Sequence, residues 1–258
     1  MIKFTKRALI LTMSALVLIG FGIASLYYES QNNKVDPRVI EARKLYKKYD
    51  QYAEVNDFAA VLHLLDSVED VYRVYPHYRN SYEIAVLENN RAATYLTMAI
   101  HTGNKPVSLD GVNILTKDTL LQMAKAHSKN AISHYQAWLD TYGAMGQEAI
   151  RAQIKPDFFD GLAEDDAQKR RDYLDNRVEE IQTAQLENKR RLSVALTNYG
   201  IVLRHEEKYA EAITHYKDAL KLWEHNLAAK NNLNILLGKP IEKRNFIQKL
   251  FPPEKDKE

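Results

Sequence analysis

Hydrophobic residues recur every three or four positions along most of this chain, which is the spacing of one face of an α-helix. Asp36 and Pro37 predict the start of a helix that extends to about Ala53. A turn follows, and Asp57 then caps a second helix that ends before Pro76. The two helices predict an antiparallel hairpin of roughly 35 to 40 residues, the size of one helical repeat.

The same spacing predicts further helices over about 80–100, 118–142 and 164–207, with Gly143 capping the second of these. Gly and Pro gather between them, at 101–117 and 143–161. We expect a loop at 101–117, longer than compact bundles normally use, and at 143–161 an irregular connector with a short helix near 147–153. The chain therefore predicts an all-α fold.

Eight positions within 164–207 alternate steps of four and three residues, as in a coiled-coil seam. Gln185 and Asn188 interrupt it, which favours packing against neighbouring helices of the same chain, although a homodimer is also possible. The seam positions are Leu174, Val178, Ile181, Gln185, Asn188, Leu192, Ala195 and Tyr199.

The first 29 residues differ from the rest of the chain in having a basic start followed by a long uncharged, apolar run. Lys3, Lys6 and Arg7 precede an uncharged run over 8–28, whose 21 residues are long enough to span a bilayer as a helix. The basic flank predicts a cytoplasmic N-terminus and an extracytoplasmic, periplasmic C-terminal domain, tethered to the inner membrane by a single pass. The alternative is a signal peptide cleaved near Ala24, before Ser25, but the run exceeds the usual apolar length of such peptides.

The composition excludes several kinds of functional site. The chain has no Cys, so disulfides and thiolate sites are excluded. Its net charge of +2 does not indicate a nucleic-acid-binding surface. The His residues lack the spacing of metal ligands, and no phosphate-binding loop or nucleophile motif occurs. We predict no metal, no cofactor and no catalysis. A hydrolase is the less favoured alternative, with only Lys105 and Asp110 available in the 101–117 loop.

The segment 193–226 resembles a tetratricopeptide repeat at nearly every signature position of its 34 residues. The small residues Gly200 and Ala212 allow two helices to approach closely, and Tyr209 and Tyr216 fill the space beside the contact. The sequence departs from the family at Leu196, where Trp is usual, and at Glu224, where Pro often ends the repeat. The signature positions are Leu196, Tyr199, Gly200 and Leu203 in the first helix and Tyr209, Ala212, Tyr216 and Ala219 in the second.

The resemblance implies that the first helices of successive pairs line a concave groove that holds a segment of another protein. Asn198 and Asn232 fall at equivalent positions, where family members often hydrogen-bond a peptide backbone with Asn. The groove candidates are Thr197, Asn198, Ile201, Arg204, Asn231, Asn232 and Ile235. Weaker matches at 58–68 and 131–138 resemble the second helices of two divergent repeats.

Four regions follow: a signal-anchor helix over 1–29, a linker over 30–36, a tetratricopeptide-like solenoid over 37–240 and a C-terminal cap with a charged tail over 241–258. The apolar residues of the tail could cover the end of the repeat stack, or dock on a membrane or partner. We expect a membrane-anchored scaffold that binds a protein partner. A cleaved, exported chaperone or adaptor is the alternative.

Overall fold

A computed structural model describes residues 34–101, 105–109 and 114–243. The fold is almost entirely helical, which confirms the predicted all-α class. The predicted membrane segment at 8–28 and the apolar tail after residue 243 lie outside the described residues. Within the described ranges, no helix is both long enough and apolar enough to cross a membrane.

The elements in chain order are a 3-10 turn η1 (Pro37–Val39), α2 (Ile40–Tyr46), α3 (Tyr49–Glu54), α4 (Phe58–Val74), α5 (Pro76–Arg79), α6 (Tyr82–His101), β1 (Val107–Ser108), β2 (Ile114–Leu115), α7 (Lys117–Tyr142), α8 (Gln147–Phe158), α9 (Ala167–His205), α10 (Tyr209–Leu222) and α11 (Leu227–Leu236).

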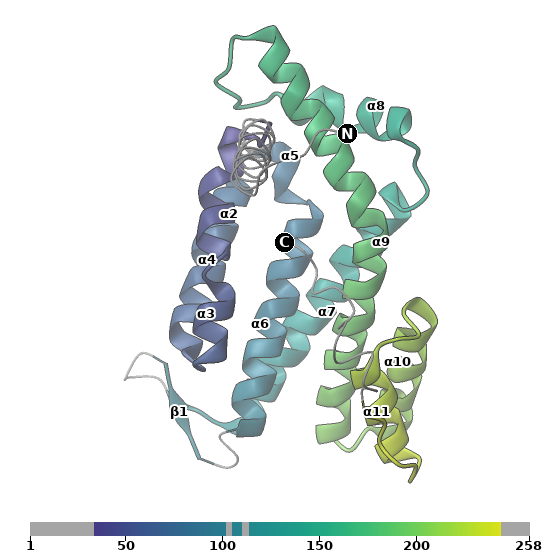
Figure 1. The fold of residues 1–258 in the computed structure, drawn as a ribbon. Coiled ribbons are helices and arrows are strands. Elements are labelled where there is room, and N and C mark those ends of the chain that lie inside the picture. Colours follow the sequence, from purple (N-terminus) through teal and green to yellow (C-terminus); the bar gives the residue numbers. More distant parts are fainter. Residues whose placement is uncertain (1–33, 102–104, 110–113, 244–258) are drawn as a thin grey trace, which may run out of the picture.

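Three successive helical pairs organise the molecule (Figure 1). They are α2 and α3 with α4, then α6 with α7, then the C-terminal part of α9 with α10, and α11 follows the last pair. Each second helix packs against its own first helix and against the first helix of the next unit, so α4 touches α6, α7 touches α9 and α10 touches α11. The first helices consequently lie in a row, with the second helices packed between them.

The predicted first helix over 36–53 is not continuous. It is divided into η1, α2 and α3, with a break at Lys47 and Lys48. The rings of Tyr46 and Tyr49 stack across this break with centroids 5.7 Å apart. The next boundary is as predicted, because Oδ1 of Asp57 accepts a hydrogen bond from the backbone N–H of Ala60 and caps α4.

The short helix predicted near 147–153 within the 143–161 connector is confirmed, but it is longer than predicted. Helix α8 runs from Gln147 to Phe158 and includes Pro156 in its last turn. Burial explains why the helix continues, since Ile150, Ile154 and Phe158 line one face and pack into the core beneath α9. The free energy of that apolar burial outweighs the one hydrogen bond lost at Pro156.

The predicted loop at 101–117 contains a short antiparallel ribbon, with Val107 opposite Leu115 and Ser108 opposite Ile114. Val107 and Leu115 are partly buried against the ends of α6 and α7. Part of this loop is therefore packed against the helical core.

Helix α9 is 39 residues long, about 58 Å, and links the two ends of the molecule. Its predicted seam packs within the chain, because Leu174, Val178, Ile181, Asn188, Leu192 and Ala195 are buried. The polar seam residue Gln185 bonds to the backbone instead, because its amide donates to the carbonyl oxygens of Tyr142 and Met145, at 2.5 and 2.8 Å. It thereby satisfies carbonyl groups at the end of α7.

Candidate partner-binding face

The C-terminal end of α9 and α10 pack around Gly200. A Cβ atom at this position would lie 2.5 Å from Cε1 of Tyr216, well inside van der Waals contact. Only glycine therefore permits this approach of the two helices. The other buried members of the contact are Leu196, Leu203, Ala212, Tyr216 and Ala219.

Two of the predicted packing residues have different outcomes: Tyr209 lies outside the contact, whereas Tyr199 packs against Leu203, Ala212 and Tyr216 as predicted. Tyr209 is 50% exposed at the first position of α10, so it does not fill the contact and that assignment is wrong. Tyr199 is half-buried and meets the ring of His215 edge to face, with centroids 4.7 Å apart. Lys129 of α7 lies over the same ring, with Nζ 5.9 Å from its centroid, so Tyr199 faces α7 as well as α10.

Asn226 joins three helices, a role that local sequence patterns do not indicate. Its side-chain oxygen caps α11 by accepting from the backbone N–H of Ala229 at 3.0 Å. Its amide nitrogen donates to the hydroxyls of Ser193 and Thr197 on α9, at 2.8 and 3.0 Å. Ser193 in turn donates to the carbonyl oxygen of Ala219 on α10 at 2.7 Å. All of these side chains are buried, so the network fixes the end of the helical stack.

The row of first helices carries hydrogen bonds between neighbouring units. Asn198 of α9 donates to the side-chain oxygen of Asn89 on α6 at 3.2 Å. Asn90, the next residue of α6, donates to the hydroxyl of Tyr46 on α2 at 2.5 Å. These contacts place α2, α6 and α9 side by side on one face.

We call this surface the first-helix face. Its half-buried residues are Tyr46 and Tyr49 on the first pair, Val86, Asn89, Asn90, Ala93 and Thr97 on α6, and Val194, Asn198 and Ile201 on α9. None of them is charged. The face thus combines apolar groups with side-chain amides, a mixture suited to both the side chains and the backbone of a bound segment.

Some of the predicted groove residues belong to the first-helix face and others do not. Thr197 is 3% exposed and is bonded to Ser193 and Asn226, so its assignment to an open groove is wrong. Asn198 and Ile201 belong to the first-helix face, and Arg204 is half-buried one turn beyond them.

The candidates on α11 have local partners. Asn231 exchanges two hydrogen bonds with the backbone of Glu242, accepting from its N–H at 2.7 Å and donating to its carbonyl oxygen at 3.0 Å. Asn232 donates to the carbonyl of Ala228 in its own helix at 2.9 Å. Asn198 and Asn232 therefore differ in environment despite their equivalent positions, and Ile235 is 53% exposed.

A network of buried and partly buried ion pairs connects the first helices α2, α6 and α9 at one end of the molecule. Arg177 of α9 is 2% exposed and its guanidinium holds both carboxylate oxygens of Glu83 on α6, at 2.6 and 3.1 Å. It also donates to Glu180 at 3.1 Å, and Glu180 receives two hydrogen bonds from Arg43 of α2, at 2.7 and 2.8 Å. Burial alone would raise the pKa of Glu83, but the charge of Arg177 outweighs it and lowers that pKa to about 2. The four side chains are thus mutually neutralised.

His77 lies beside this network. Its Nε2 accepts a hydrogen bond from Nε of Arg177 at 3.1 Å, so its proton is on Nδ1, which faces the carboxylate of Asp157 at 3.6 Å. Burial and the neighbouring charge of Arg177 lower the pKa of His77 to about 3, and the ring is therefore neutral.

The chain joins the described domain at the same end. The guanidinium of Arg38 forms a buried ion pair with Asp36 and donates to the carbonyl oxygen of Asp160 at 2.7 Å. It also lies over the ring of Phe158, 5.0 Å from its centroid. Residues 36–38 are consequently fixed against the segment that follows α8.

No family model, no curated protein and no solved structure matches this chain. In the part of the chain that the structure describes, no three His, Asp or Glu residues are grouped so as to hold a metal ion.

Proposed function

We propose that this protein is a membrane-anchored, tetratricopeptide-like scaffold that binds a protein partner on the extracytoplasmic side and has no catalytic role. The observation that carries the proposal is the first-helix face, where three helices present amide and apolar groups side by side. Side-chain amides can pair with a backbone that has no secondary structure of its own, while the apolar groups between them hold its side chains.

The approach of α9 and α10 at Gly200 supports the family resemblance within the proposal. The clearance of 2.5 Å between a hypothetical Cβ and Tyr216 explains physically why a glycine and an aromatic residue occur at these two positions. The first-helix face then corresponds to the surface on which the resemblance implies a ligand.

The ionisable groups with the largest pKa shifts have a structural role in this proposal. Arg177, Glu83 and His77 are buried and satisfy one another, so their altered pKa values follow from packing between α6, α9 and the segment around α5. Such groups hold the first helices in register, which a binding surface requires.

Crosslinking from the first-helix face tests the proposal. A photoreactive amino acid replaces Val194 in the full-length, membrane-integrated protein, and a matched control carries it at the exposed Lys217 on α10. We expect a discrete crosslinked protein from position 194 alone. The same products from both positions would place the partner elsewhere.

A charged substitution within the first-helix face provides a second test of the proposed binding. Ala93→Arg introduces a cation among the uncharged groups, and we expect at least a tenfold loss of the crosslinked product because the charge must be desolvated in the complex. Ala137→Arg, at an exposed position of α7, is the control. Unchanged helicity by circular dichroism separates lost binding from lost folding.

The alternative, an exported soluble adaptor cleaved near Ala24, uses the same face but not the anchor. N-terminal sequencing of the mature protein decides between them, since cleavage gives a chain that begins at Ser25.

A further inference from the structure

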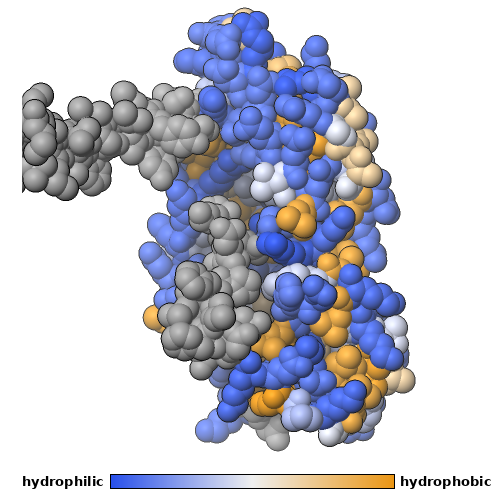
Figure 2. Space-filling view, turned by 45° about the vertical axis from the view of Figure 1, so that its right-hand side comes forward, coloured by the Kyte–Doolittle hydropathy of each residue, from blue (hydrophilic) through white to orange (hydrophobic). Residues whose placement is uncertain are grey.

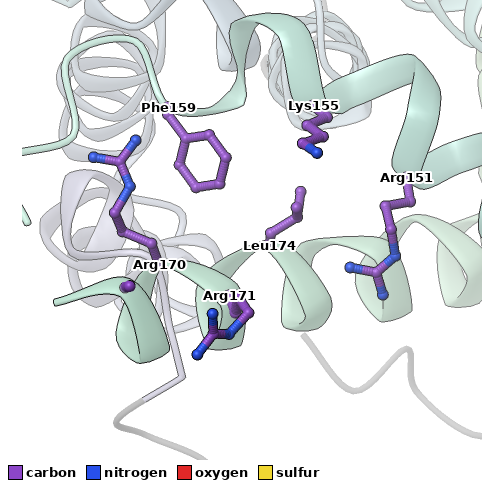
Figure 3. A pocket seen from close by; sticks show the side chains of 7 residues that line it. Arg151, Lys155, Phe159, Arg170, Arg171 and Leu174 are labelled. Atoms are coloured by element: carbon purple, nitrogen blue, oxygen red, sulfur yellow. The ribbon is translucent and has the colours of Figure 1, made fainter.

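A pocket of about 370 Å³ opens between α8 and the first turns of α9 (Figure 3). Its lining residues are Arg151, Lys155, Phe159, Ala167, Arg170, Arg171 and Leu174. Four of the seven are cationic and none is acidic. Figure 3 shows Lys155 directed into the space between the two helices, above Leu174.

Within the part of the chain that the structure describes, only one of these four cations is paired with a carboxylate. Arg151 forms an ion pair with Asp175. Arg170 donates to the carbonyl oxygen of Glu164 at 3.3 Å, and Arg171 donates to the side-chain oxygen of Gln168 at 2.7 Å. Among the described residues, no carboxylate lies at ion-pair distance from Lys155, Arg170 or Arg171. The pocket therefore has a net positive charge that an anionic ligand would balance.

The remaining lining is apolar. Leu174 is 5% exposed and forms the floor, and the half-buried ring of Phe159 forms one side, with the guanidinium of Arg170 4.4 Å from its centroid. This contact keeps a positive charge beside the apolar side of the pocket. The matching ligand carries a compact anionic group on an apolar or glycerol-like body.

The position of the pocket indicates which such ligand it meets. Asp160, which follows Phe159 in the chain, accepts the hydrogen bond from Arg38, so residues 36–38 are fixed at the same corner of the molecule as the pocket. The seven linker residues 30–36 span at most about 25 Å when extended. With residues 8–28 in the bilayer, a linker of this length allows the pocket to reach the lipid headgroups.

Non-specific adhesion to an anionic surface is disfavoured at this corner. The segment between α8 and α9 carries Asp160, Glu164, Asp165 and Asp166, and an extended anionic surface would be repelled by them. A single phosphate inside the pocket meets the cations of the lining instead. The arrangement selects one headgroup rather than a membrane surface.

The geometry points to a site for the phosphate of one anionic phospholipid, bound at Lys155 within the cationic lining of the pocket, with its glycerol region on Phe159 and Leu174. This inference rests on the proposed membrane anchor for the source of the ligand, though not for the chemistry of the pocket. Binding of a lipid here would hold the domain at a fixed orientation to the bilayer.

The test uses full-length protein in nanodiscs of neutral phosphatidylcholine. The chain has no Cys, so Ala152→Cys on the exposed side of α8 provides a single site for an environment-sensitive fluorophore. Short-chain phosphatidic acid is titrated in, and glycerol phosphate and inorganic phosphate are titrated in parallel. The variant Lys155→Glu/Arg171→Glu is compared with the control Lys189→Glu/Lys217→Glu, which changes two exposed lysines elsewhere by the same charge.

We expect saturable binding of phosphatidic acid, weakened at least tenfold in the pocket variant and unchanged in the control, with equal helicity in all three proteins. Equal affinity for glycerol phosphate would overturn the lipid assignment in favour of a soluble phosphate ligand. Equal loss in both double variants, or no saturable signal, would overturn the site itself. If carbonate extraction releases the protein from membranes while phosphatidic acid still binds, the anchor fails and the pocket stands.

Discussion

Acidification should destabilise the domain through His77 before it affects the carboxylates. The side chain is 5% exposed and its pKa is lowered to about 3 from an ordinary 6.5, because burial and Arg177 both disfavour the cation. Between these values the unfolded chain binds a proton that the folded protein excludes, so stability is fully present above pH 6.5 and falls as the pH drops towards 3. Protonation would also remove the acceptor that Nε2 offers to Arg177.

The size of the effect follows from the two pKa values. From pH 7.5 to 5.0, the unfolded state gains about 2 kcal/mol relative to the folded state from this one group. Glu83, with its pKa lowered to about 2 by Arg177 against the opposing effect of burial, loses its contribution mainly below pH 4.5. Urea unfolding at pH 7.5 and 5.0 therefore isolates the histidine from that ion pair.

A variant comparison completes the test. His77→Gln retains an oxygen that can accept from Arg177 and a nitrogen that can donate towards Asp157, but does not titrate. Burial also lowers the pKa of His205 and His215, so the difference between the two proteins, rather than the total pH dependence, measures His77. We expect the variant to lose about 2 kcal/mol less than the wild type, and the exposed-site control His63→Gln to match the wild type. Identical pH dependence of the wild type and His77→Gln would refute the assignment.

Three further outcomes can be measured. Gly200→Ala should lower the free energy of unfolding by about 1 to 3 kcal/mol, because its Cβ overlaps the ring of Tyr216; an unchanged urea midpoint would contradict the close contact. Glu83→Gln should cost about 3 to 5 kcal/mol by leaving the Arg177 guanidinium buried beside a neutral amide, whereas loss of a surface pair such as Lys221 with Asp218 should cost under about 1 kcal/mol. The full-length protein should resist alkaline carbonate extraction, and its release would argue against an anchor at 8–28.

Much of the helical frame could be predicted from local sequence. Apolar residues at three- and four-residue spacing locate α4, α6, α7 and the long α9, and the cap at Asp57 fixes one boundary. Errors occur where tertiary contacts override local preference. Pro156 signals a helix end, yet burial of Ile154 and Phe158 on either side of it keeps α8 helical.

Side-chain sites are harder to predict than helices. The role of Gly200 follows from the repeat pattern, but the burial of Thr197 depends on Asn226, a residue 29 positions away. Arg177 is adjacent to the seam residue Val178, so a cation at the edge of an apolar stripe was the available signal for the ion network. Its partner Glu83 is 94 residues away, a distance that periodicity does not bridge.

The lower half of the molecule, around the last hairpin, exposes hydrophobic patches among hydrophilic residues (Figure 2). Ile235, Leu237 and Ile241 contribute to the apolar surface of the C-terminal end. In the described structure, Asn231 and Lys230 bind Glu242 and turn the chain back along α11. Most of the predicted cap over 241–258 lies outside the described residues.

The ion pair between Arg43 and Glu180 joins the first helical pair directly to the N-terminal half of α9, whose C-terminal part belongs to the third pair, and Arg38 also contacts Asp160 in the segment before α9. In a simple repeat array each unit touches only its neighbours, so terminal units can melt while the centre stays folded. Here the first pair cannot detach without breaking the partly buried ion pair that it forms with α9. The two ends of the row are thus thermodynamically coupled, and the domain should unfold in one cooperative transition in which no partly melted array accumulates.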